Sequence, residues 1–144
     1  MTLTFRSPAF ADGETIPARH TCEGANAVPP LEWSGVPAGA KTLLITCDDP
    51  DAPHGTFHHW AAYNIPATDT GALTGAVQAV NDFGRRGYGG PCPPPGDRPH
   101  RYVFRLAALR DRIEAPPTAR AAEIRRLAAA LELAAATFTG RFGR

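Results

Sequence analysis

The chain has 144 residues, of which 43% are hydrophobic and 20% are charged. This length suits one domain, and the composition excludes both a chain disordered by composition and one built from membrane-spanning segments. A formal net charge of +1 argues against a dedicated nucleic-acid binder and against a polybasic membrane anchor. We therefore expect residues 1–144 to form a single globular domain that has no nucleic acid as a partner.

The N-terminal sequence MTLTFR lacks the basic start and the apolar run of about 7 to 15 residues that define a signal peptide. The most apolar stretch, residues 127–138, is interrupted by Glu132 and is shorter than the ~18 residues that a membrane-spanning helix needs. These features predict a cytoplasmic protein that does not insert into a membrane.

The cysteines are odd in number and widely spaced, at Cys22, Cys47 and Cys92, and no two of them form a C-x-x-C pair. Such spacing indicates neither a disulfide framework nor a structural zinc site. We expect three reduced thiols.

Two strands are expected in the first half of the chain. Lys41–Cys47 is apolar on both faces, which is typical of a central, doubly buried strand, and Pro50 and Pro53 end it because proline has no N–H group to pair. A second strand is expected over Phe57–Ile65. Alternation predicts one face with Phe57, His59, Ala61 and Tyr63 and another with His58, Trp60, Ala62 and Asn64, so that the two histidines point in opposite directions.

Residues 81–99 are rich in glycine and proline and exceed the ~12–15 residues that irregular connections usually reach. Such a segment is typical of a functional or a disordered loop. A third strand is expected over Tyr102–Leu109, because apolar residues there follow strand spacing. One of its faces would carry Tyr102, Phe104, Leu106 and Ala108, and the other Val103, Arg105, Ala107 and Leu109.

A helix is expected after Pro116 and Pro117, with Thr118 as its N-cap and Gly140 at its end. Its apolar stripe would consist of Ile124, Leu127, Leu131, Ala134, Ala135 and Phe138, which recur at helical spacing. A helix that buries this stripe on a sheet gives a mainly β architecture, rich in antiparallel strands, with a C-terminal α-helix.

Three titratable side chains lie at the ends of the expected strands. Asp49 follows the first strand, His59 lies on the second, and His100 comes shortly before the third. They can converge on one pocket, in which a carboxylate fixes the tautomer of an imidazole and leaves its other nitrogen to face an anion. Pro93 and Pro94 would give this pocket a rigid apolar wall.

The same residues allow other interpretations. His59 and His100 can be hydrogen-bonded structural residues, with Asp49 capping a turn. Two histidines and a carboxylate also match an open zinc or iron site, although the tight local spacing of such sites is absent. Cys92 leaves a Cys–His hydrolase open, but its loop offers no helix N-terminus to activate the thiol, which favours a buried, inert cysteine.

Long motifs in the chain resemble the two signatures of the phosphatidylethanolamine-binding proteins. In chain order they are DPDAP at 49–53, FHHW at 57–60 and YNIP at 63–66, then GYGGPCPPPG at 87–96 and HRYVF at 100–104. The flanking pieces TCEG at 21–24 and NDFG at 81–84 are similar to the bacterial branch, the Raf kinase inhibitor-like proteins of the YbhB/YbcL type. The resemblance covers essentially the whole chain.

This resemblance implies a fold in which a large antiparallel sheet packs on a smaller one, with a C-terminal α-helix. It also implies a pocket for a small anion, such as phosphate, a phosphorylated head group or a carboxylate. By position, the ligand-binding residues would be Asp49, Ala52, Pro53, His59, Pro93, Pro94, His100 and Tyr102.

The function expected from the resemblance is anion binding without catalysis, with a regulatory role as one option, in a homodimer that needs no metal or cofactor. Two alternatives stay open. One is a regulator that binds a protein partner through the pocket rim. The other is a hydrolase or metal-assisted enzyme that uses Asp49, His59 and His100.

Overall fold

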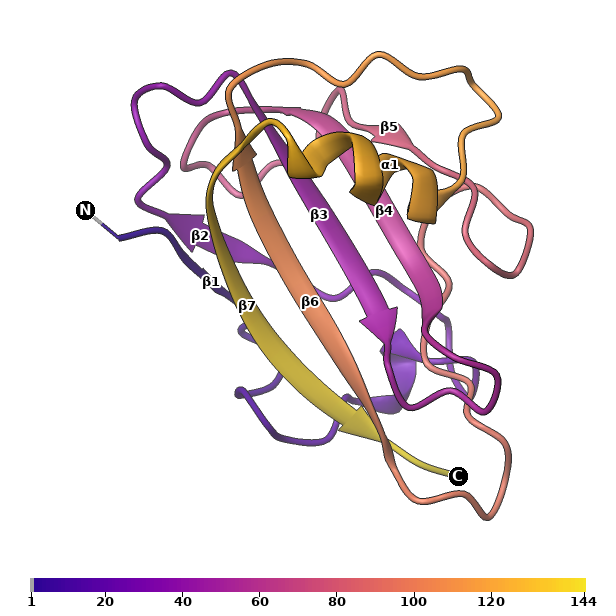
Figure 1. Ribbon diagram of the computed structural model, residues 1–144. Helices are drawn as coiled ribbons and strands as arrows, with labels where there is room; N and C mark the ends of the chain where they lie inside the picture. Colours follow the sequence, from indigo (N-terminus) through magenta and orange to yellow (C-terminus); the bar gives the residue numbers. More distant parts are fainter. Residues whose placement is uncertain (1) are drawn as a thin grey trace.

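The computed structural model describes residues 2–144, whose strands form two antiparallel sheets (Figure 1). A two-stranded sheet pairs β1 (Thr4–Arg6) with β2 (Glu32–Ser34). A five-stranded sheet has the order β5-β4-β3-β6-β7. Its strands are β3 (Thr42–Asp49), β4 (Phe57–Pro66), β5 (Val77–Gln78), β6 (His100–Leu109) and β7 (Glu132–Phe142). The helices are the 3-10 helix η1 (Ala18–His20) and the α-helix α1 (Ala121–Ala129).

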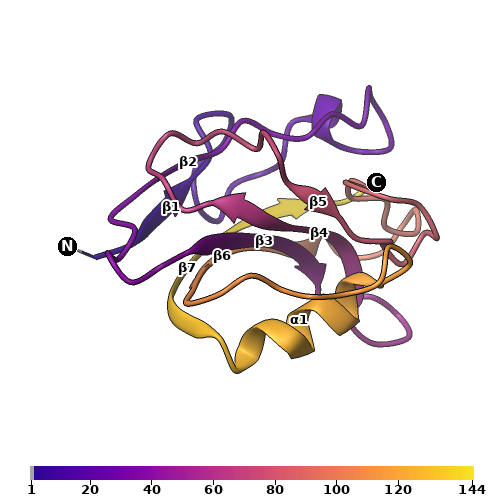
Figure 2. The same ribbon diagram turned by 90° about the horizontal axis from the view of Figure 1, so that it is seen from above.

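The five-stranded sheet is covered on both faces (Figure 2). The small sheet of β1 and β2 lies over one face, where Phe5 and Trp33 pack with Phe104 in one apolar core. The helix α1 covers the other face, where Ile124 packs with Leu109 in a second core. This arrangement confirms the expected mainly β fold, in which a large antiparallel sheet packs on a smaller one and a helix lies near the C-terminus.

β3 lies in the middle of the large sheet, between β4 and β6, and all of its residues are buried. Leu43 and Ile45 belong to the core under the small sheet, whereas Leu44 belongs to the core under α1. The expected central strand is confirmed, because a strand covered on both faces needs apolar residues in succession.

A bulge in β4 turns His59 toward the small-sheet side, together with its neighbour Trp60. The pairing of β3 with β4 shifts by one residue between Trp60 and His58, so that His59 is the extra residue. The expectation that His58 and His59 point in opposite directions is confirmed. The expected grouping of His59 with Ala61 and Tyr63 is wrong, because these two residues face α1 and strict alternation makes no allowance for a bulge.

The helix is much shorter than expected. α1 covers Ala121–Ala129 and begins after Arg120, not at Thr118. Residues 132–142, which were expected to hold the second half of the helix, form the edge strand β7. Their apolar residues also follow a period of two, with Ala134, Ala136 and Phe138 on the sheltered face and Leu133, Ala135 and Thr137 exposed. No helix within residues 2–144 is long and apolar enough to cross a bilayer.

Pairing with β6 decides the conformation of this last segment. Phe138 pairs with Phe104, and their rings stack with centroids 4.9 Å apart. Gly140, expected to end the helix, lies inside β7, where a Cβ atom would come within 2.4 Å of Ile16 and 2.7 Å of Phe10. Gly140 therefore permits close packing of the N-terminal segment on the sheet.

Two of the cysteines form a disulfide, which corrects the expectation of three reduced thiols. Cys22 and Cys92 are bonded across a sequence separation of 70, with Cα atoms 5.4 Å apart. The fold brings them together because the Cys22 amide donates a 3.0 Å hydrogen bond to the Pro91 carbonyl. Cys47 is free and buried, and burial raises the pKa of its thiol well above the usual value.

Candidate functional site

A pocket of about 100 Å³ opens where β3, β4 and β6 meet the Gly/Pro loop. All of the residues expected to bind a ligand line it, namely Asp49, Ala52, Pro53, His59, Pro93, Pro94, His100 and Tyr102. The pocket is also lined by Phe57, Phe83 and Cys92. The geometric expectation that Asp49, His59 and His100 surround one concavity is therefore met, and their role in binding stays a prediction.

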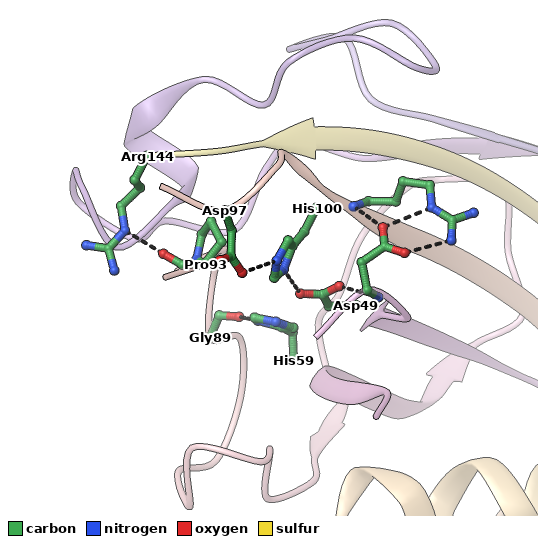
Figure 3. Close-up of polar contacts among 9 residues, drawn as sticks. Asp49, His59, Gly89, Pro93, Asp97, His100 and Arg144 are labelled. Carbon is green, nitrogen blue, oxygen red and sulfur yellow. Dashed lines mark hydrogen bonds and ion pairs between the residues drawn. The ribbon is translucent and has the colours of Figure 1, made fainter. Parts of the chain in front are cut away.

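Asp49, the last residue of β3, anchors the polar floor of the pocket (Figure 3). One of its oxygens accepts a 2.7 Å hydrogen bond from Nδ1 of His100, and the other accepts a 2.8 Å bond from the Asp51 amide. The Asp49 side chain is only 4% exposed, so its negative charge depends on these donors for compensation.

His100 lies between two carboxylates, Asp49 on its Nδ1 and Asp97 on its Nε2, the latter at 3.1 Å (Figure 3). Burial lowers the pKa of His100, but the hydrogen bonds to both carboxylates outweigh it, so that the pKa lies above its usual value. The sequence-based expectation that the second nitrogen of His100 faces a ligand is wrong in this structure, because Asp97 occupies it.

His59 has a different environment. Its Nδ1 donates a 2.6 Å hydrogen bond to the carbonyl of Gly89 (Figure 3), so a backbone oxygen, not the expected carboxylate, fixes its tautomer. Burial lowers the pKa of His59, which keeps the ring neutral at neutral pH. Its Nε2 is then a hydrogen-bond acceptor, and it has no partner within residues 2–144.

Tyr102 brings a hydroxyl group to the same site. Its ring packs edge-on against His59, with centroids 5.3 Å apart. It also stacks on His100 at a centroid distance of 6.4 Å, with an angle of 27° between the ring planes. Burial and the nearby Asp49 carboxylate raise the pKa of Tyr102, so the hydroxyl keeps its proton. That hydroxyl is buried and has no hydrogen-bond partner in the part of the chain that the structure describes.

The apolar walls include residues that sequence reasoning did not single out. Phe83 is 47% exposed, although its ring lies edge-on to Phe57 at 4.7 Å and to His59 at 5.4 Å. Asp97 was also missed, and the one signal for it was a carboxylate three residues before His100 in a glycine-rich turn. Such a signal is weak, because aspartate is common in turns for its own local hydrogen bonds.

The arrangement bears on the enzyme alternatives. No group of three or more His, Cys, Asp and Glu residues within residues 2–144 is placed to hold a metal ion. Cys92 lines the pocket but is disulfide-bonded, so it is neither the inert thiol expected nor a thiolate nucleophile. What the pocket offers is a hydroxyl donor and an imidazole acceptor within apolar walls.

Comparison with known sequences places these residues in a family. The model for phosphatidylethanolamine-binding protein matches residues 6–143. A UPF0098 protein of Methanothermobacter thermautotrophicus is 46% identical over 127 residues, which are 81% of this chain and 83% of that protein. The UPF0098 protein YbcL of Escherichia coli is 47% identical over 116 residues, 68% of this chain and 63% of YbcL. The putative lipoprotein LppC of Mycobacterium tuberculosis is 44% identical over 122 residues, 81% of this chain and 60% of LppC.

Solved structures agree with the sequence comparison. The crystal structure of E. coli YbcL, described as a member of the mammalian PEBP family, superposes with a TM-score of 0.92 at 37% identity and covers 100% of this chain and 99% of the other. The putative PEBP homologue CT736 of Chlamydia trachomatis superposes with a TM-score of 0.88 at 32% identity, covering 99% and 98% of the two chains. The chain belongs to the phosphatidylethanolamine-binding protein family.

Proposed function

We propose that the pocket binds a small oxyanion, such as phosphate or a phosphorylated head group, without changing it chemically. The observation that carries this proposal is the buried hydroxyl of Tyr102 beside Nε2 of His59, because neither atom has a hydrogen-bond partner among residues 2–144. A buried donor without a partner costs about 1–3 kcal/mol, and an oxygen of a bound ligand removes that cost.

The donors and acceptors favour a phosphate group that carries one negative charge and at least one proton. Tyr102 donates its hydroxyl proton to one phosphoryl oxygen, and neutral His59 accepts the proton of a P–OH group at Nε2. The buried carboxylate of Asp49 repels a second negative charge, which selects the monoanion. The proline and phenylalanine side chains around these groups exclude water and so strengthen the polar contacts.

Asp97 competes with a bound anion for His100. Its carboxylate holds the Nε2 proton of His100, and its side chain is 40% exposed on the turn before β6. An anion that takes this proton must therefore displace Asp97 toward solvent. In this proposal Asp97 is an internal competitor, which lowers the affinity of the pocket for free anions.

A second candidate, regulation of a protein partner through the pocket rim, is favoured by one observation. The ring of Phe83 is 47% exposed at the edge of the pocket, and aromatic side chains are enriched at the centres of protein interfaces. An enzyme is less well supported, because the pocket holds no free thiol and no serine among its lining residues.

Location and oligomeric state are also proposals. The homodimer is implied by the resemblance of the sequence motifs. The Cys22–Cys92 disulfide favours an oxidising compartment over the expected cytoplasmic location, because structural disulfides persist in oxidising compartments and are rare in the cytosol.

Calorimetric titration with inorganic phosphate tests the proposed pocket. His59→Ala should weaken phosphate binding at least tenfold, whereas His58→Ala, one residue away on the opposite face, should leave it within about twofold. Tyr102→Phe, which preserves the ring packing, should weaken it similarly to His59→Ala. Equal affinity in all variants, or no heat of binding for the wild type, would overturn the proposal.

A further inference from the structure

A second, larger concavity lies beside the pocket and shares His100 with it. It has a volume of about 610 Å³ and is lined by Asp51, Asp97, Arg98, Pro99, His100, Arg101 and Arg141. We refer to it as the arginine groove. It is built from the turn before β6, the first residues of β6 and Arg141 near the end of β7.

Two of the arginines that line this groove lie side by side on neighbouring strands. Arg101 of β6 and Arg141 of β7 are direct partners in the antiparallel ladder. Side chains of such partners lie on the same face with Cβ atoms about 4.5–5.5 Å apart, and like charges placed there destabilise the sheet. Both positions are exposed, so burial of the stems offers little compensation.

Internal ion pairs leave positive charge in the groove. Asp51 binds Arg101 with both oxygens, at 3.0 and 2.8 Å, and Asp97 is bound to His100. The side chains of Arg98 and Arg141 make no ion pair and no hydrogen bond with the rest of residues 2–144. Two guanidinium groups therefore remain available to an external anion.

We propose that the arginine groove is a second anion site, which binds the phosphate groups of a phosphorylated molecule. The planar guanidinium groups of Arg98 and Arg141 present paired N–H donors that match two oxygens of one phosphate group. The bound anion also relieves the repulsion between Arg141 and Arg101. The unpaired donors of this site, Arg98 and Arg141, do not line the pocket, although the two concavities share His100.

The experiment is a calorimetric titration with inorganic pyrophosphate at low salt, using wild type and matched variants. The double variant Arg98→Gln/Arg141→Gln should lose at least tenfold in affinity at the groove, while Arg110→Gln, an exposed arginine at the other end of β6, should change it less than twofold. Asp51→Asn should tighten binding several-fold, because it releases the guanidinium of Arg101. Unchanged affinity in the double variant, or weaker binding in Asp51→Asn, would overturn the proposal.

Two further arms separate this site from the pocket and identify the source of the phosphate. His59→Ala should leave pyrophosphate binding at the groove intact. The groove proposal can therefore hold even if the pocket proposal fails. Sedimentation with vesicles of phosphatidylglycerol, compared between wild type and the double variant, distinguishes a lipid head group from a soluble phosphorylated molecule. Either source supports the anion site if the double variant abolishes binding, and binding that survives the double variant contradicts it.

Discussion

Replacing Tyr102 by phenylalanine should stabilise the protein and weaken anion binding at the same time. The substitution removes a buried hydroxyl that has no hydrogen-bond partner in the described part of the chain and leaves the ring contacts with His59 and His100 in place. Relief of an unsatisfied buried donor raises the free energy of unfolding by about 1–3 kcal/mol. For a chain of this length each kcal/mol corresponds to roughly 3 °C, so the melting temperature should rise by roughly 3–9 °C.

The same change removes a hydrogen bond to a charged ligand, which contributes about 1.5–3 kcal/mol, or roughly 10- to 100-fold in affinity. Thermal unfolding and phosphate calorimetry measure the two effects separately. Tyr88→Phe is the matched control, because the hydroxyl of the half-buried Tyr88 donates a 2.7 Å hydrogen bond to the His20 carbonyl. Tyr88→Phe should destabilise the protein by about 1 kcal/mol and leave phosphate affinity unchanged. A Tyr102→Phe variant that is less stable than wild type, or that binds phosphate equally well, would contradict this role of the hydroxyl.

Asp97→Asn should tighten phosphate binding several-fold at pH 7, because the internal competitor on His100 is gone; weaker binding by calorimetry would instead make Asp97 a positioning residue. Cys22→Ser should lower the free energy of unfolding in denaturant titrations by about 2–4 kcal/mol, and an unchanged midpoint would argue against the disulfide. The pKa of His58 is raised by its hydrogen bond to Asp48, so the stability that this contact provides is fully present below the usual histidine pKa and is lost as pH rises through the folded-state value. His58→Gln should therefore cost more stability at pH 6 than at pH 9, and an equal cost at both would contradict that assignment.

The sequence was most informative where both faces of an element have the same environment. Most of β3 could be predicted, as the strand expected over 41–47, because Leu43, Leu44 and Ile45 are apolar in succession and a strand buried on both faces favours such a run. The last two residues of β3, Asp48 and Asp49, lie beyond the expected strand. The residues on each face of β6 could also be predicted from strict alternation, because the pairing of β6 with β3 contains no bulge.

The errors arose where a distant part of the chain decides the local conformation. Alanine-rich residues 131–138 satisfy both a helical and a strand period, and only pairing with β6 selects the strand. His59 lies on the opposite face from Ala61 and Tyr63 because one extra residue in β4 shifts the register. The alternating sequence pattern gives no sign of this bulge. Cys22 and Cys92 were expected to be reduced because sequence spacing carries no information about two loops that meet in space.

The site was predictable in its membership but not in its hydrogen bonds. Motif order placed Asp49, His59 and His100 around one pocket, since strand ends in the sheet meet at one edge. Which atom each imidazole bonds depends on where the loop carbonyl of Gly89 and the carboxylate of Asp97 lie, and these belong to the irregular loop. The polar chemistry of the site therefore follows from the tertiary structure of residues 81–99.

Anion binding in the pocket can be tested directly by a phosphate titration followed through the imidazole nitrogen and C–H signals of all histidines by NMR. Signals of His59 and His100 should shift saturably, and the His59 ring should gain a hydrogen bond at Nε2. Signals of His58, on the opposite face of the sheet, should stay within experimental error. Equal shifts of all three histidines, or a saturable shift confined to His58, would contradict the claim that the pocket binds the anion.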